Sequence, residues 1–329
     1  MEATQKNFLN SNKLLKMRRS FNKRNLIERA SNLLCHIIII GIIFLILYPF
    51  IEKTLTTFLP YEDLADKTVK YIPKSFGSDN LNTLRWTIGI MDYWKALGNT
   101  AILCLVTSLI QVMVCTFVSY GFARFKFPGR GILFATVIVV LMIPPQVIMT
   151  SLYMKFSFFN LLGLPTLFTG GTINITEGLW PFVLMSMFAI GFKNSLYIYM
   201  LNQFFRGLPT EIEEAGMIDG SNHFGIFFRL MLPNAVPMMV TVFLFAFSWQ
   251  WTDNYYTSLF LGKSETFKVL TIQLTEIGKY PGSDVIFTPV FKSALNGTGI
   301  LLTILPLVIL YLFGQKFFVQ GVSQSGIVG

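Results

Sequence analysis

The sequence predicts an all-α, polytopic membrane protein with six transmembrane helices. Apolar residues make up 53% of its 329 residues and charged residues only 13%, about half the charged share of a soluble domain. The mean hydropathy is +0.58. Six apolar runs are long enough to cross a hydrocarbon core about 30 Å thick. This composition leaves too little polar surface for a water-exposed globule, and it excludes disordered, collagen-like and disulfide-scaffold proteins.

The first apolar run, residues 33–51, is expected to be a retained transmembrane helix. The basic stretch before it is long for a signal peptide, and no small-x-small cleavage site follows. The other expected spans are residues 96–122, 132–153, 179–205, 235–261 and 298–318.

Two irregularities lie within these spans. Pro144-Pro145 removes two backbone donors and predicts a kink in the third span. The fourth span contains the polar run Lys193-Asn194-Ser195. That run indicates either a broken helix facing protein or water, or a re-entrant or frayed segment near the outer interface with Lys193 snorkelling. The residues leave both alternatives open.

The distribution of Lys and Arg predicts the orientation. Residues 1–32 carry eight basic and two acidic residues, and the loop after the second span carries three basic residues and no acid. Residues 52–95 are balanced, with six of each sign. Because positively charged loops remain in the cytoplasm, both termini are expected to be cytoplasmic, and residues 52–95 and 263–297 extracytoplasmic.

The resulting organisation has five parts. They are a basic cytoplasmic segment (1–32), the first helix (33–51), an extracytoplasmic loop (52–95), a core with five transmembrane helices (96–320) and a cytoplasmic tail (321–329). The core contains one long cytoplasmic loop, residues 206–233.

Residues 206–233 carry helix start and stop signals. Thr210 and Glu213 have the spacing of a capping box, which predicts a helix start. Gly220 is placed to end that helix in the left-handed conformation. Ser221 is expected to cap a second helix that Pro233 closes. Without further information, the simplest interpretation is a connector that packs on its own bundle.

A longer pattern in this loop changes that interpretation. The string Glu214-Ala215-Gly216, three residues, Gly220, nine residues, Leu230, then Leu232-Pro233 resembles the EAA loop of ABC importer permeases. Five further stretches of this chain resemble carbohydrate-type permeases. They are Asn99-Thr100, Tyr120-Gly121-Phe122-Ala123-Arg124, Ile143-Pro144, Trp251-Thr252-Asp253-Asn254 and the run Gln315 to Gly321. The resemblance covers residues 93–321 and is to the smaller six-helix subunit of maltose-like importers.

The resemblance implies a type I ABC importer permease fold in a bacterial plasma membrane. It implies a second homologous permease, two ATPase subunits that hold ATP and Mg, and an extracytoplasmic solute-binding protein that delivers a carbohydrate, which is expected to be an oligosaccharide. It also implies that Glu214 pairs with an ATPase arginine, that Met217 and Ile218 form an apolar dock, and that Gly220 permits a bend. The implied coupling residues are Glu214, Ala215, Gly216, Met217, Ile218, Asp219 and Gly220.

Substrate contact is expected from the aromatic and polar cluster Trp249, Trp251, Asp253, Asn254 and Tyr255. Sugars offer apolar CH faces to rings and hydroxyls to carboxylates and amides. The alternative is an interfacial aromatic belt with Asp253 among the lipid headgroups. Gln111 and Gln146 either line the same path or bond a neighbouring helix.

Other chemistries find no support in the residues. Gly262-Lys263-Ser264 lacks the first glycine of a P-loop, because position 257 is Thr. His36 and His223 are too far apart in the sequence for a metal cluster. No catalytic residue, metal or cofactor is therefore expected in this chain, and its basic N-terminus is expected to face anionic membrane lipid, with no nucleic acid as partner.

The predicted function is therefore that of a transport subunit and not an enzyme. The alternative function is an ATPase-independent secondary transporter or channel, which has no use for an EAA loop. A further hypothesis is that the outer loop of residues 263–297 reaches the binding protein through residues 278–283.

Overall fold

The computed structural model describes residues 23–160, 171–191, 193–279 and 288–326. The described part is helical, with one isolated β-bridge between Phe159 and Ile173, so the all-α prediction is confirmed. Its helices before residue 208 are α2 (Lys23–Thr57), α3 (Tyr61–Ala65), η1 (Ser78–Leu81), α4 (Asn82–Ile90), α5 (Tyr93–Arg124), α6 (Arg130–Met142), α7 (Pro145–Ser157), α9 (Trp180–Met187) and α10 (Asn194–Gly207). The later helices are α11 (Glu211–Ile218), α12 (His223–Ile226), the π-helical turn η2 (Phe227–Met231), α13 (Leu232–Thr252), α14 (Tyr255–Leu261), α15 (Leu270–Lys279) and α16 (Pro289–Gly326).

Four helical stretches of the described chain are long and apolar enough to cross a membrane: residues 28–57, 93–124, 223–252 and 289–317. A fifth span arises if α6 and α7 count as one, although their axes meet at 103°. The expected third span is therefore two helices instead of one kinked helix. Pro144 and Pro145 explain the separation, since Pro144 is extended at the start of α7 and neither proline can donate a backbone hydrogen bond.

The fourth expected span, residues 179–205, is also two helices, α9 and α10, which are separated ahead of Asn194. Ala189 and Lys193 lie between them with positive φ angles of 54° and 64°. A left-handed residue with a side chain costs about 1–2 kcal/mol and cannot continue a right-handed helix. The structure therefore shows an interruption at this polar run, and its position relative to the membrane remains a prediction.

Two further expected spans have different bounds. The fifth, 235–261, is divided at Asp253 and Asn254 into α13 and α14. The last, 298–318, is part of the longer helix α16. This helix begins at Pro289 and packs against α4 and α15.

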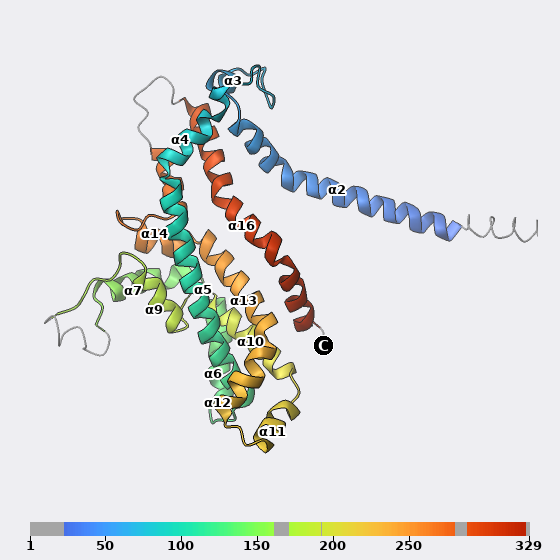
Figure 1. The fold of residues 1–329 in the computed structure, drawn as a ribbon, viewed down its shortest axis with the longest axis vertical. Coiled ribbons are helices and arrows are strands. Elements are labelled where there is room, and N and C mark those ends of the chain that lie inside the picture. The colour runs from blue at the N-terminus through green and yellow to red at the C-terminus, as the bar shows by residue number, and fades with distance from the viewer. Residues whose placement is uncertain (1–22, 161–170, 192, 280–287, 327–329) are drawn as a thin grey trace, which may run out of the picture.

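Helix α5 is the centre of the arrangement, because α9, α10, α13 and α15 all pack against it. Figure 1 shows α5 running from α4 at one end of the molecule to α12 and α11 at the other. The short helices α3 and α4 thus lie at the end opposite α11. This separation agrees with the charge pattern, which predicts opposite sides of the membrane for residues 52–95 and 206–233.

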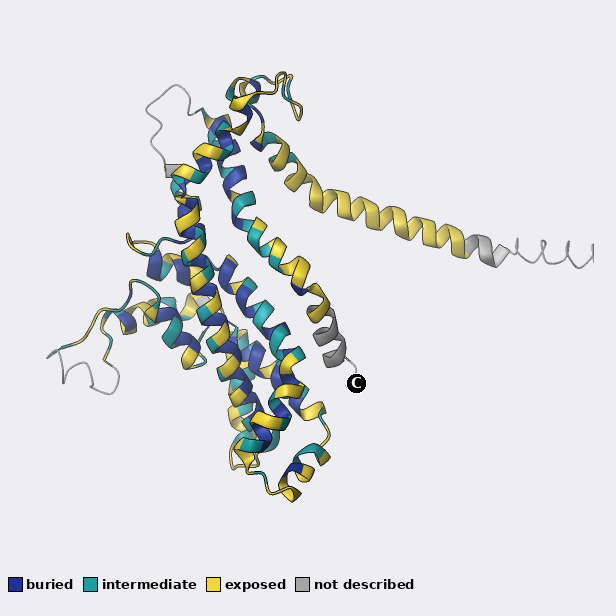
Figure 2. Ribbon diagram, in the orientation of Figure 1, coloured by how far each residue is buried: buried dark blue, intermediate teal, exposed yellow. Residues whose placement is uncertain are grey.

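Helix α2 projects away from the bundle (Figure 1) and its residues are exposed along almost the whole apolar run (Figure 2). No residue in the most apolar stretch of α2 is buried within the described structure. Exposure of so much contiguous apolar surface to water is unfavourable. Lipid or another protein must therefore cover α2.

Candidate coupling and transport sites

The start of α11 is held by an ion pair instead of the expected capping box. Thr210 is the N-cap residue, but its side chain makes no capping hydrogen bond. The Glu213 carboxylate instead lies 3.4 Å from Nε of Arg124, which is the last residue of α5. Arg124 Nε and Glu213 Oε1 have no hydrogen-bond partner among the described residues, so their contact is an ion pair without a hydrogen bond, and the capping signal of the local sequence is not realised.

The end of α11 matches the prediction for Gly220. Gly220 has a φ of +78°. Its backbone N–H donates to Met217 O, and the N–H of Ser221 donates to Gly216 O, each at 3.0 Å. These two bonds form a Schellman motif, which satisfies carbonyls at the helix end.

The helix after Gly220 differs from the expectation in both of its limits. Asn222, not Ser221, is the capping residue, and its Oδ1 accepts a 2.7 Å hydrogen bond from Gly225 N. Pro233 does not close a helix but lies in the first turn of α13. The preceding π-helical turn η2 changes the hydrogen-bond register, so the missing N–H of Pro233 does not interrupt the chain of helices.

The two faces of α11 have different surroundings. Gly216 is buried against the next helices, where an added Cβ would lie 2.8 Å from Leu230 Cδ1 and 3.1 Å from Ile226 Cγ1. On the other side Ile218 is 86% exposed and Met217 48% exposed, and Glu214 is exposed beside them. Helix α11 thus packs on its own bundle through one face and presents an apolar face with a carboxylate through the other.

Two residues of the predicted substrate cluster have internal contacts in the structure. The Asp253 carboxylate accepts hydrogen bonds from the backbone N–H groups of Tyr255, Tyr256 and Thr257 and from the Thr257 hydroxyl, at 2.9–3.4 Å. It is only 4% exposed, so it caps the start of α14. Trp251 Nε1 donates to Thr303 O at 2.9 Å and joins α13 to α16.

The other predicted pathway residues belong to three separate parts of the fold. Trp249, Asn254 and Tyr255 are exposed near the junction of α13 and α14, and Gln146 is exposed in the first turn of α7. Gln111 is buried on α5, 2% exposed. An added Cβ on Gly191 would lie 2.7 Å from Gln111 Nε2 and 3.2 Å from the side chain of Asn194. Gln111 therefore faces the break between α9 and α10.

The break between α9 and α10 also contains the polar side chains of Lys193 and Asn194, which were not predicted as site residues. The amide of Asn194 is 1% exposed, and within the described residues neither of its atoms has a hydrogen-bond partner. The Lys193 ammonium lies 5.1 Å from the ring centroid of Trp249. An unpaired buried amide costs about 1–3 kcal/mol, so the group is suited to water or to a polar solute. The polar run 193–195 was the sequence signal for it.

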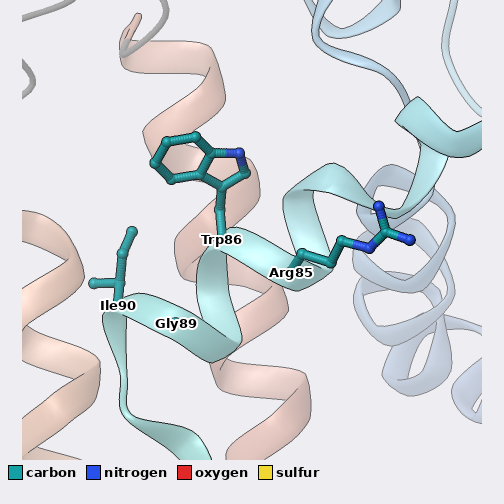
Figure 3. A pocket seen from close by; sticks show the side chains of 4 residues that line it. All are labelled: Arg85, Trp86, Gly89 and Ile90. Carbon is teal, nitrogen blue, oxygen red and sulfur yellow. The ribbon is translucent and has the colours of Figure 1, made fainter.

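Two hollows lie in the described chain, one away from the break and one beside it. One, of about 490 Å³, lies on α4 and is lined by Arg85, Trp86, Gly89 and Ile90; Figure 3 shows Trp86 and Ile90 on one side of the helix and Arg85 extending away. The other, of about 410 Å³, is lined mainly by the aromatic and aliphatic side chains of α7, α9 and the break. Neither is lined by a predicted pathway residue. No group of three or more potential metal ligands occurs among the described residues.

Comparisons with known proteins agree on one family and one fold. Residues 111–324 match the model of the family described as binding-protein-dependent transport system inner membrane component. A probable ABC transporter permease of Pyrococcus horikoshii is 28% identical, over 86% of this chain and 92% of its own length. The arabinooligosaccharides transport system permease protein AraQ of Halalkalibacterium halodurans is 25% identical, over 92% of this chain and 99% of its own length.

The solved structures include a chain of the same fold. It belongs to a bacterial ABC transporter involved in the import of the acidic polysaccharide alginate. The TM-score is 0.71 at 16% sequence identity, with 91% of this chain and 99% of the other covered. The folded arrangement is therefore shared although most of the residues differ.

Proposed function

The chain belongs to the binding-protein-dependent transport system inner membrane components, and from this membership we propose that it forms half of the transmembrane pathway of an ATP-driven carbohydrate importer. It is a multi-pass membrane protein and a transport subunit, not an enzyme. An oligosaccharide is the proposed solute, since one relative is named for arabinooligosaccharides. A secondary transporter or channel is the disfavoured alternative, because membership in this family implies a partner ATPase.

The exposed face of α11 is the observation that carries the proposal. A helix of eight residues is too short to be stable alone in water, and here one of its faces is packed while Ile218 remains 86% exposed. An exposed apolar face with one carboxylate suits a partner surface that has an apolar cleft and a cation. The proposed partner at this face is an ATPase subunit, with Glu214 paired to an arginine and Met217 and Ile218 in the cleft.

The remaining partners follow from the proposed geometry. A second homologous permease would cover the apolar surface of α2 and complete the pathway, and a second ATPase would bind that permease. ATP and Mg would be held by the ATPase subunits, and a solute-binding protein would dock at the end of the molecule that carries α3 and α4. Both termini of the chain are proposed to be cytoplasmic. The earlier hypothesis for residues 278–283 concerns a segment whose positions 280–283 lie outside the described residues.

The proposed solute path passes the break between α9 and α10. Gln111 and Asn194 supply amides there, and amides bond sugar hydroxyls both as donors and as acceptors. Trp249, Asn254, Tyr255 and Gln146 are exposed in the single chain, so they remain candidates for the path once a second permease is present. Asp253 and Trp251 support it indirectly, by holding α14 and α13.

Co-purification with the ATPase tests the proposal. Truncation of one partner in a desolvated charge pair costs about 2–5 kcal/mol, which corresponds to a loss of affinity of about thirtyfold or more. Glu214→Ala should therefore insert in the membrane but retain little ATPase. Glu211→Ala removes an exposed acid from the same helix and should retain it. Equal retention by the two variants would refute the role assigned to Glu214.

A further inference from the structure

A nearly buried ion pair joins α11 to the cytoplasmic end of α5. Arg124 Nε lies 3.4 Å from Glu213 Oε1, and the two side chains are 8% and 13% exposed. Arg124 Nη2 also donates a 2.7 Å hydrogen bond to Leu208 O, in the turn just before α11. Tyr120, one turn earlier on α5, lies within electrostatic reach of the Glu213 carboxylate. The last turn of α5 thus holds both the start of α11 and the turn that leads into it.

This pair is separate from the proposed ATPase contact. Glu213 is turned toward the bundle, whereas its neighbour Glu214 is exposed. A buried ion pair contributes little net stability compared with apolar packing of the same volume, because both charges lose their hydration. What such a pair does supply is a directional link between two elements. The two atoms, 3.4 Å apart, have no hydrogen-bond partner among the described residues, so the link between them is electrostatic.

Helix α5 extends from this pair past the break between α9 and α10 to the start of α15. It is continuous over 32 residues and carries Gln111 beside the break of the fourth span. Near its other end, Thr100 Oγ1 accepts a 2.9 Å hydrogen bond from Leu270 N. Asn99 Nδ2 donates at 2.8 Å to Lys268 O, just before α15. A displacement of its cytoplasmic end therefore reaches the break and the outer segment through one continuous helix.

We propose that Arg124 and Glu213 are positioning residues that transmit the movement of α11 to α5, and that α5 carries this movement to the solute path. The proposal rests on the proposed function, because it requires an ATPase docked on α11. It adds a division of labour within the loop. Glu214 and the apolar face hold the ATPase, whereas the Arg124–Glu213 pair converts the movement of the ATPase into movement of the membrane helices.

The test uses the complete transporter, reconstituted with its partner permease, ATPase and binding protein. The variants are Glu213→Gln, Arg124→Gln and the charge exchange Arg124→Glu with Glu213→Arg, and the control is Glu211→Gln on the exposed side of α11. Two quantities are measured: the amount of ATPase that co-purifies, and the number of solute molecules transported per ATP hydrolysed.

The single variants should retain the ATPase as the control does. They should transport about tenfold less solute per ATP, which is a typical magnitude for the coupling between two sites in a protein. The charge exchange should recover most of that loss. If Glu213→Gln does not reach the membrane, Glu213→Asp takes its place, since it keeps the charge but shortens the side chain, and the same uncoupling is expected.

Unchanged transport per ATP in the single variants would overturn the proposal. Loss of the ATPase in these variants, as expected for Glu214→Ala, would also overturn it, by assigning Glu213 to the docking surface. Failure of the proposed function would look different, because then even the unaltered chain would not co-purify with an ATPase.

Discussion

Gly220 is the position where a small substitution should have the clearest effect on transport. Its φ of +78° lies in the left-handed region, and an added Cβ would meet no atom within 4 Å. Steric crowding therefore contributes nothing to the cost of a side chain here. The cost comes from the backbone conformation and from the two 3.0 Å hydrogen bonds that depend on it.

The expected cost can be worked out from that conformation. An L-residue with a Cβ pays about 1–2 kcal/mol in the left-handed region, a β-branched residue pays more, and Asn pays the least of the polar residues. Because α11 has only eight residues, its own stability is close to zero. A penalty of about 1–2 kcal/mol would reduce the correctly folded loop by about five- to thirtyfold.

Solute uptake in membrane vesicles measures this effect. Uptake should fall in the order Gly220→Asn, Gly220→Ala, Gly220→Val, with Val abolishing it while the protein still reaches the membrane. Gly131→Ala is the matched control, since a Cβ there also enters open space and Gly131 is not among the residues with positive φ. Equal uptake by Gly220→Ala and Gly131→Ala, or normal uptake by Gly220→Val, would refute the reasoning.

Two other predictions concern the membrane part. Asp253→Ala should lower the free energy of unfolding by about 1–2 kcal/mol, the usual cost of losing a helix cap, whereas Asn254→Ala should change it little; thermal unfolding in detergent compares them, and equal losses would show that Asp253 is not the cap. Gly191→Ala should displace the Gln111 amide, which lies 2.7 Å from the added Cβ, and slow uptake without releasing the ATPase. Gly98→Ala, whose Cβ meets nothing within 4 Å, is the control. Equal uptake by Gly191→Ala and Gly98→Ala would show that Gln111 does not line the path.

The sequence by itself determined the features that depend on neighbouring residues. Composition and the length of the apolar runs predict a membrane protein of helices, because lipid requires apolar side chains and internally bonded backbone. Pro144-Pro145 predicts an interruption, and Gly220 predicts a left-handed helix end. The spacing of the loop 206–233 predicts the family. Each of these signals is contained within a few turns of chain, so the folded neighbours do not alter it.

The tertiary structure decided which groups meet across helices. Thr210 and Glu213 have the right spacing for a capping box, yet Glu213 pairs with Arg124, because α5 brings a nearly buried guanidinium to it from a distant part of the chain. Asp253, which the sequence predicts as a pathway carboxylate, caps α14 in the structure, and its place in the pathway remains a prediction. Likewise Gln111 gains its place opposite Gly191 only once α5 packs beside the broken fourth span. A polar side chain inside a membrane bundle bonds to whatever partner packing places nearest, and the sequence around it does not contain that partner.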